Sequence, residues 1–129
     1  MRQALDARGI DVVFLVSPTT TDDRLVEAAR LGRGFLYAIS RLGVTGARDA
    51  VATSAEPLVA RLRKVSRLPI ALGFGISRPE HVREVMRYAD AAVVGSALVQ
   101  VIADAVAAGQ DAPAAVERFV QWLKGTAPA

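Results

Sequence analysis

A short glycine-containing turn, GFGIS at residues 73–77, has the composition of a phosphate-binding loop. It follows the apolar run 70–72 and precedes a helix-start pattern. In that pattern Ser77 is the predicted N-cap, Pro79 lies in the first turn and Glu80 comes three residues after the cap. Where a strand, a glycine turn and a helix N-terminus follow one another, backbone N–H groups and the helix dipole favour negative charge. The stretch therefore predicts an anion site at the start of a helix.

A second turn has the same layout. Residues 91–94 form an apolar run, Gly95 and Ser96 make the turn, and a helix is predicted from residue 97. A dinucleotide fingerprint would need a third glycine where Arg78 stands, which excludes that kind of site. The pair of turns instead matches the loops after the last two strands of a (β/α)8 barrel, a frequent phosphate site. The alternative is that the glycines serve only to make tight turns.

The rest of the chain supplies the elements that position these turns. Strands are predicted at the four apolar runs 12–16, 35–39, 70–72 and 91–94. The first of them has the unbroken apolar character of a strand buried on both faces. One amphipathic helix is predicted to begin after a cap at Thr21 or Asp22 and to end at residue 31. Further amphipathic helices are predicted at residues 55–65, 79–88, 97–107 and 114–124. A helix end is also predicted before Gly9.

This alternation implies a parallel α/β sheet with right-handed crossovers. Four βα units amount to half of a (β/α)8 barrel. A complete barrel needs roughly 200 residues or more, whereas this chain has 129. We therefore expect residues 1–129 to form a single partial (β/α)8 domain that carries the phosphate-binding turns.

Composition excludes several classes of protein. Hydrophobic residues make up 52% of the chain, which favours a packed core, and the absence of cysteine excludes disulfides and thiolate metal sites. No apolar run is long enough to cross a membrane and no signal peptide is visible, so a cytoplasmic protein is expected. The net charge is +3, and its one local basic group consists of Arg61, Arg63, Lys64 and Arg67. No aromatic residues interleave with this group, which favours a solvated helix face over a nucleic-acid surface.

An ordered set of motifs resembles the tryptophan synthase alpha chain family. The motifs are FLVSPTTTD at 14–22, GFLY at 34–37, SRLGVTGA at 40–47, GFGIS at 73–77 and VGSA at 94–97. They match the C-terminal half of the family's chain, strands five to eight of its barrel. The resemblance implies a lyase of tryptophan biosynthesis that cleaves indole-3-glycerol phosphate to indole and glyceraldehyde 3-phosphate. This retro-aldol reaction requires no metal and no cofactor.

The resemblance also assigns roles to individual residues. The family's phosphate-binding positions correspond to Gly46, Gly75, Gly95 and Ser96. The positions lining its indole pocket correspond to Tyr37, Phe74 and Val93. A threonine of the mobile loop that closes over the ligand corresponds to Thr45. The family's two catalytic carboxylates lie in its first half, so the resemblance places no catalytic residue in this chain.

Local carboxylates are poor substitutes for that pair. Asp11 and Asp90 precede predicted strands, which places them at the end of the sheet away from the turns. Asp49 follows the mobile loop and is the only one able to swing toward the site. His81 is expected to play an ordinary helix role, and Trp122 a packing role.

The predicted sheet also suggests partners besides the phosphorylated substrate or product. Strands 12–16 and 91–94 would have unpaired edges, and Phe14 and Val16 are expected to face an uncovered interior. Either the family's first half or a second copy of the chain could close those edges. The resemblance adds the tryptophan synthase beta chain as a partner of the full-length family.

Two alternatives remain open at this point. Another phosphate-binding barrel enzyme, similar to indole-glycerol-phosphate synthase, would need a lysine at the carboxyl end of a strand. Neither Lys64 nor Lys124 stands there. The other alternative is a non-catalytic phosphate-binding or assembly module, which the missing carboxylate pair favours.

Overall fold

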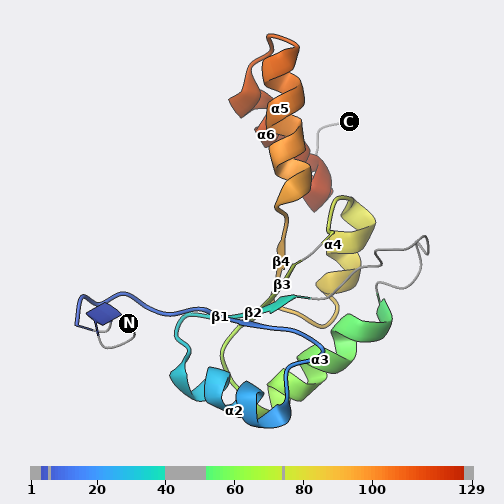
Figure 1. Ribbon diagram of the computed structural model, residues 1–129. Helices are drawn as coiled ribbons and strands as arrows, with labels where there is room; N and C mark the ends of the chain where they lie inside the picture. The colour runs from blue at the N-terminus through green and yellow to red at the C-terminus, as the bar shows by residue number, and fades with distance from the viewer. Residues whose placement is uncertain (1–3, 6, 40–51, 74, 127–129) are drawn as a thin grey trace.

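The computed structural model describes residues 4–5, 7–39, 52–73 and 75–126, and strands alternate with helices along them. The elements are β1 (Phe14–Val16), α2 (Asp22–Leu31), β2 (Leu36–Ile39), α3 (Ala52–Val65), β3 (Ile70–Gly73), α4 (Pro79–Val85), β4 (Ala91–Val93), α5 (Ser96–Ala107) and α6 (Ala112–Lys124). The strands form one parallel sheet in the order β1-β2-β3-β4 (Figure 1). The predicted α/β class, four βα units of a half-barrel, is confirmed.

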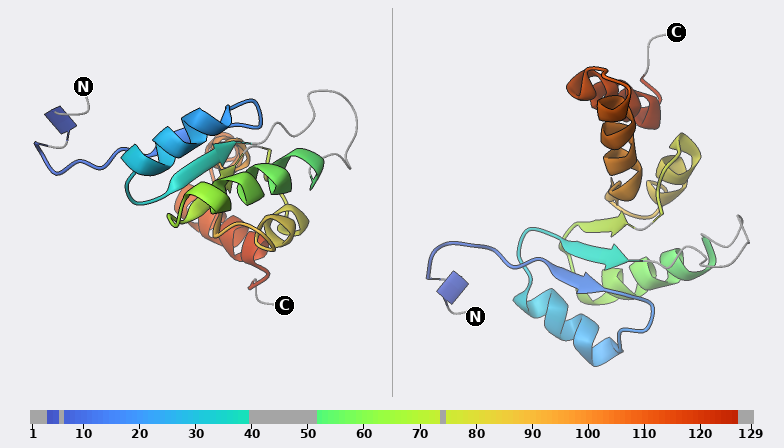
Figure 2. Two further views of the ribbon diagram at one scale, coloured as in Figure 1. Left: turned by 90° about the horizontal axis from the view of Figure 1, so that it is seen from below. Right: turned by 45° about the horizontal axis from the view of Figure 1, so that its top comes forward.

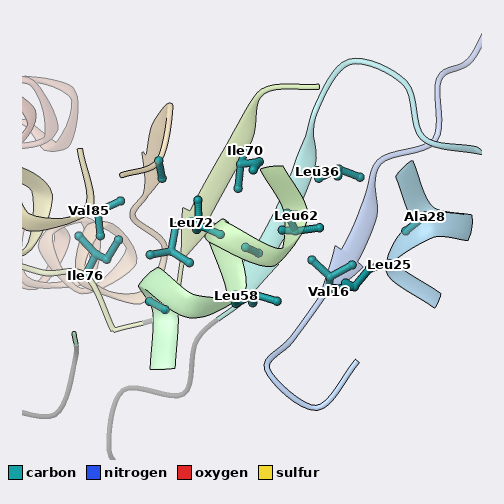
Figure 3. Close-up of a cluster of buried hydrophobic side chains, with 14 residues drawn as sticks. Val16, Leu25, Ala28, Leu36, Leu58, Leu62, Ile70, Leu72, Ile76 and Val85 are labelled. Atoms are coloured by element: carbon teal, nitrogen blue, oxygen red, sulfur yellow. The ribbon is translucent and has the colours of Figure 1, made fainter. Parts of the chain in front are cut away.

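One face of the sheet packs on helices and makes the core. Figure 3 shows the strand residues of this face against side chains of α2, α3 and α4. The labelled core residues are Val16, Leu25, Ala28, Leu36, Leu58, Leu62, Ile70, Leu72, Ile76 and Val85. Because side chains alternate along a strand, the residues between them point to the opposite face. We call that opposite face the inner face; it consists of Leu15, Tyr37, Ile39, Ala71, Gly73, Ala91 and Val93.

The prediction for the first strand was wrong in two respects. β1 covers only Phe14–Val16, and it is not buried on both faces, because Leu15 is 61% exposed while Val16 is 2% exposed. Helices cover only one face of this edge strand. The inner-face residue of β1 is therefore Leu15, and neither Phe14 nor Val16 loses its cover: Val16 belongs to the core and Phe14 packs against it.

The helix boundaries differ from the predicted ones by a few residues. α3 begins at Ala52 instead of residue 55, and α4 ends at Val85 because Met86 closes it as C-cap. The N-terminal helix end is confirmed, since Gly9 follows the helical residues 4–5 with a left-handed φ of 66°. α6 starts after Asp111, whose carboxylate accepts a hydrogen bond from the Ala114 N–H at 3.1 Å.

Two residues of the basic group, Arg61 and Arg63, form ion pairs on the solvent-exposed face of α3. Arg61 contacts the Asp22 carboxylate at 2.6 Å, and Arg63 contacts the Asp90 carboxylate at 2.7 Å. Asp90 also accepts a hydrogen bond from the Ile70 N–H at 2.7 Å. That backbone hydrogen bond, helped by the Arg63 guanidinium, holds the pKa of Asp90 below its ordinary value. As predicted, Asp90 lies at the amino end of the strands, where it joins β3 to β4.

The helices are unevenly distributed around the sheet. Figure 2 shows α2 and α3 along the same face of the sheet, while the α5–α6 hairpin extends beyond β4. α4 contacts β4 and α6, so it links the hairpin to the sheet. None of the helices in the described ranges has the length and hydropathy needed to span a bilayer.

Candidate functional site

A cavity of about 520 Å³ opens at the carboxyl ends of β2, β3 and β4. Its wall consists of Tyr37, Gly75, Ile76, Ser77, Val93, Gly95, Ser96 and Ala97. Its volume falls in the range of small-molecule sites. The carboxyl end of the strands is also where parallel α/β sheets bind ligands. The two glycine turns, separate in the sequence, therefore meet at one cavity.

The cavity brings together most of the positions that the family resemblance singles out. Gly75, Gly95 and Ser96 come from the phosphate set, and Tyr37 and Val93 come from the indole set. The other positions fall outside the described residues: Gly46, Phe74 and Thr45. Sequence reasoning missed Ile76 and Ala97 as wall residues, although the GFGIS and VGSA motifs contain them.

The two glycines of the GFGIS turn serve different purposes. Gly75 has a left-handed φ of 72°, a conformation that favours glycine, and it is exposed at the cavity wall. Gly73 lies at the end of β3 and its φ is outside that range. The prediction that both residues form the tight turn is therefore right only for Gly75. Gly73 instead provides room, because a Cβ added there would lie 2.5 Å from the Tyr37 Oη.

The amino end of α5 is the best-placed group of anion donors in the cavity. Gly95 is the N-cap, and its carbonyl accepts hydrogen bonds from the Leu98 and Val99 N–H groups at 2.9 and 3.1 Å. The first N–H groups of a helix have no acceptor within it, and here they belong to wall residues Ser96 and Ala97. The Ser96 side chain adds a hydroxyl beside them. A Cβ added to Gly95 would meet no described protein atom within 4 Å, so the space next to this helix end is open.

The predicted cap of α4 was wrong. The N-cap is Arg78, with extended backbone, and no side chain caps the helix. Pro79 explains the shift, since a proline at the first helical position forces the residue before it into an extended conformation. The Ser77 N–H donates to the His81 Nδ1 at 3.3 Å instead of facing an anion, and Glu80 pairs with Arg83 at 3.2 Å.

His81 consequently has a local structural contact. Because its Nδ1 accepts from the Ser77 N–H, the neutral ring carries its proton on Nε2. The contact fixes the backbone between the GFGIS turn and α4. α4 has only seven residues, whereas α5 has twelve, so the amino end of α5 is the stronger source of backbone donors for an anion.

The described wall of the cavity carries no ionised side chain. Among the described residues, no group of three or more His, Cys, Asp or Glu side chains could hold a metal ion. Lys64 and Lys124 lie on α3 and α6, away from the strand ends, as the sequence predicted. Trp122 is 45% exposed and packs on Phe119 with ring centroids 5.7 Å apart, so it is not part of the wall. The arrangement can bind an anion next to an apolar group. Asp49, the carboxylate expected to be able to swing toward the site, falls outside the described residues.

Known proteins match this chain along nearly its whole length. The profile of the family described as tryptophan synthase alpha chain matches residues 1–127. The alpha chain of Acidothermus cellulolyticus is 47% identical over 120 residues, which cover 93% of this chain and 44% of that protein. The alpha chain of Phenylobacterium zucineum is 47% identical over 123 residues, covering 95% and 44%.

Solved structures agree with the sequence matches. A chain of the α2β2 tryptophan synthase complex from Pyrococcus furiosus gives a TM-score of 0.83 at 36% identity, and the match covers 96% of this chain and 49% of that chain. A tryptophan synthase structure from M. tuberculosis gives 0.75 at 28% identity, covering 99% and 45%. The chain spans less than half the length of the curated relatives described above. With its half-barrel, its glycine turns and these matches, the chain belongs to the tryptophan synthase alpha chain family.

Proposed function

We propose that this chain carries the phosphate- and indole-binding part of a tryptophan synthase alpha-type lyase. The reaction is the cleavage of indole-3-glycerol phosphate to indole and glyceraldehyde 3-phosphate, in the cytoplasm. One observation carries the proposal: both glycine turns and the amino end of α5 meet at a single cavity at the carboxyl ends of the strands. A phosphate needs directed donors, and that convergence supplies them.

In this proposal the phosphate lies at the start of α5. The N–H groups of Ser96 and Ala97 and the Ser96 hydroxyl donate to its oxygens, and the left-handed backbone at Gly75 lets the anion approach closely. Gly46 is proposed to add a further backbone donor. Because these donors are mostly main-chain groups, their positions are fixed by the fold before any ligand binds.

The indole ring is proposed to lie on the apolar part of the same wall. Tyr37 and Val93 are neighbours of the phosphate donors in the cavity, and an aromatic ring prefers a flat apolar slot with few polar groups. Phe74 is proposed to add a second aromatic surface. Thr45 is proposed to belong to the loop that closes over the bound substrate.

Carbon–carbon cleavage needs more than binding. A base must take a proton from the glycerol side chain, and an acid must deliver one to the indole ring. None of the described wall residues has an ionised side chain that could act as this base or this acid. We therefore propose that the chain binds the phosphorylated substrate but that cleavage requires carboxylates from the half of the alpha chain that it does not span. We assign beta-chain binding to the complete alpha chain.

Calorimetry and an indole-release assay test this proposal together. Indole-3-glycerol phosphate and glycerol 3-phosphate should both bind the purified chain, glycerol should not, and no indole should appear. Equal heats for glycerol 3-phosphate and glycerol would overturn the assignment of the phosphate site. Release of indole above the uncatalysed rate would show that the chain is active by itself. It would then contradict the proposal that cleavage requires carboxylates from the rest of the alpha chain.

The non-catalytic alternative is favoured by the same uncharged wall. A phosphate-binding module that evolved away from catalysis would bind inorganic phosphate and glycerol 3-phosphate without any gain from the indole ring. Tighter binding of indole-3-glycerol phosphate than of glycerol 3-phosphate separates the lyase-type site from that module.

A further inference from the structure

The sole histidine of the chain, His81, contacts the wall of the cavity. Its Nδ1 accepts a hydrogen bond at 3.3 Å from the N–H of Ser77, which is a wall residue. Both residues are half-buried. An imidazole changes its charge between about pH 5 and pH 8, where other ordinary side chains keep theirs. His81 can therefore place a pH-dependent charge next to a wall whose described residues carry no charge.

The charged groups in and just after α4 pair with one another and leave this ring without a carboxylate. Glu80 pairs with Arg83 at 3.2 Å, and Glu84 pairs with Arg87 at 3.1 Å. β4 packs on α4 and contains no charged residue. The remaining charged residues to consider are the N-cap of α4, those of the packed helix α6, and the residue of α3 that acts on Tyr88: Arg78, Glu117, Arg118, Lys124 and Glu56. Among the described residues no carboxylate forms an ion pair with His81, so a charge on its ring would not be neutralised within the described fold.

Protonation of His81 would change two things at the wall. Nδ1 would carry a hydrogen, so it could no longer accept from the Ser77 N–H, and the ring would have to turn away. The ring would also become a cation that attracts an anion in the cavity. The described wall residues offer an anion only backbone N–H groups and hydroxyls. A bound anion and a proton on His81 should consequently stabilise each other, because such coupling is reciprocal.

We propose that anion binding in this cavity is linked to protonation of His81, so that the site holds an anion more tightly in mildly acidic solution. This inference rests on the proposed phosphate site and adds to it a residue that belongs neither to the wall nor to either glycine turn. His81 is a positioning residue, since it acts through Ser77 and through its charge. Because the ring is half-buried and solvent screens its charge, the gain in affinity should be about threefold.

NMR of the histidine ring gives the first test. Sulfate is the probe, because it keeps both of its charges throughout this pH range, whereas a phosphate ester titrates within it. The ring signals are unambiguous, since the chain contains one histidine. At fixed ionic strength, saturating sulfate should move the titration of the ring to higher pH by roughly half a unit, which corresponds to the threefold gain in affinity. A titration that bound sulfate leaves unchanged would overturn the linkage.

Calorimetry with neutral variants separates this proposal from the phosphate site itself. Wild type should bind sulfate about threefold more tightly at about pH 5.5 than at about pH 8. His81→Asn should bind with the same affinity at both pH values, because its Oδ1 can accept from the Ser77 N–H but cannot become charged. His81→Gln, which has a higher helix propensity, is a second neutral variant.

Two results would contradict the proposal in different ways. Wild-type binding that is equal or weaker at the lower pH, or a gain that both neutral variants share, would overturn the role of His81 and leave the phosphate site in place. The absence of sulfate binding at either pH would overturn the phosphate site, and the linkage with it.

Discussion

The Tyr37 ring lies against the backbone of β3 at Gly73, where an added Cβ would require the ring to move. A Cβ added to Gly73 would lie 2.5 Å from the Tyr37 Oη, 2.8 Å from Cε2 and 3.0 Å from Cζ. The two residues are on neighbouring strands and share the inner face of the sheet. Gly73 thus determines how closely the ring approaches β3, and through the ring it shapes one wall of the cavity.

Replacing Gly73 with alanine should therefore displace the ring or strain the strand. We expect Gly73→Ala to lower the free energy of unfolding by about 1 kcal/mol, the low end of the cost of overpacking, because the crowding atoms belong to the end of one side chain that can shift. In a Tyr37→Ala background the same substitution should cost much less, since the atoms that crowd the new Cβ are gone. Urea unfolding of the four proteins at one fixed concentration measures this coupling. Equal costs in both backgrounds would show that Tyr37 does not account for the glycine.

Arg61 fastens the loop after β1 to helix α3. Its guanidinium donates to the Thr20 carbonyl at 2.7 Å, to the Pro18 carbonyl at 3.2 Å and to the Asp22 carboxylate at 2.6 and 2.9 Å. Because Asp22 is 82% exposed, solvent screens the ion pair. The two backbone carbonyls should therefore contribute more to stability than the carboxylate does.

Arg61→Ala is expected to lower the free energy of unfolding by about 1–2 kcal/mol. Arg61→Lys should recover little of the loss, because an ammonium cannot reproduce the planar fork of donors. Arg83→Ala, which removes an exposed pair with Glu80 on α4, is the control and should cost no more than about 0.5 kcal/mol. Full recovery by lysine in chemical denaturation would mean that charge alone, not the fork, holds the loop.

Sequence patterns were sufficient for the order of strands and helices, because glycines, prolines and hydrophobic periodicity act locally. They were not sufficient for β1. An apolar run indicates that the side chains on both faces of a strand can be buried, but it does not show whether helices or other strands pack on both faces. The Arg61–Asp22 contact joins residues 39 apart in sequence, and Arg63–Asp90 joins residues 27 apart. No local pattern encodes pairings at such distances.

The site was only partly accessible from the sequence. The motifs named Gly75 and Ser96, and the parallel sheet explains why their two turns meet at one end. The cap at Ser77 was mispredicted because Pro79 outweighed the serine, moving the N-cap to Arg78. The room that Gly73 leaves for Tyr37 had no signal, since it depends on the register between β2 and β3.

The acid sensitivity of the fold should depend on Asp90. Its folded-state pKa is below the ordinary value of 3.8, chiefly because its carboxylate accepts from the Ile70 N–H. A depressed carboxyl pKa stabilises the fold above the unfolded pKa, and the contribution disappears as pH falls through the folded pKa. Asp90→Asn should therefore cost about 1 kcal/mol at neutral pH, less than the usual value for a charged hydrogen bond because the side chain is 43% exposed and screened by solvent.

The difference between wild type and Asp90→Asn should narrow below about pH 4, as the wild-type carboxyl takes up its proton. Urea unfolding at a series of pH values measures it. Asp11→Asn removes an exposed carboxylate and is the control for the loss of one negative charge. A gap that stays constant down to the lowest pH would contradict the role assigned to the Asp90 charge.

Ser96 should contribute one side-chain donor to the bound phosphate. A hydrogen bond to a charged acceptor is worth roughly 1.5–3 kcal/mol, so Ser96→Ala should weaken glycerol 3-phosphate binding about tenfold or more. The backbone N–H of residue 96 remains in the variant, which should keep residual affinity. Gln100→Ala, one turn further along α5 and outside the cavity wall, should bind like wild type. Calorimetry that finds unchanged affinity for Ser96→Ala would place the anion elsewhere.

The most direct test of the phosphate site is an amide NMR titration of the chain with glycerol 3-phosphate. We expect saturable shifts concentrated at the amides of Gly75, Gly95, Ser96 and Ala97, which converge on the cavity. The competing location is the basic group of α3, where Arg63 and Lys64 would attract an anion without any built site. Shifts confined to α3, or no saturable shifts at the two glycine turns, would contradict the claim that this half-barrel holds the phosphate.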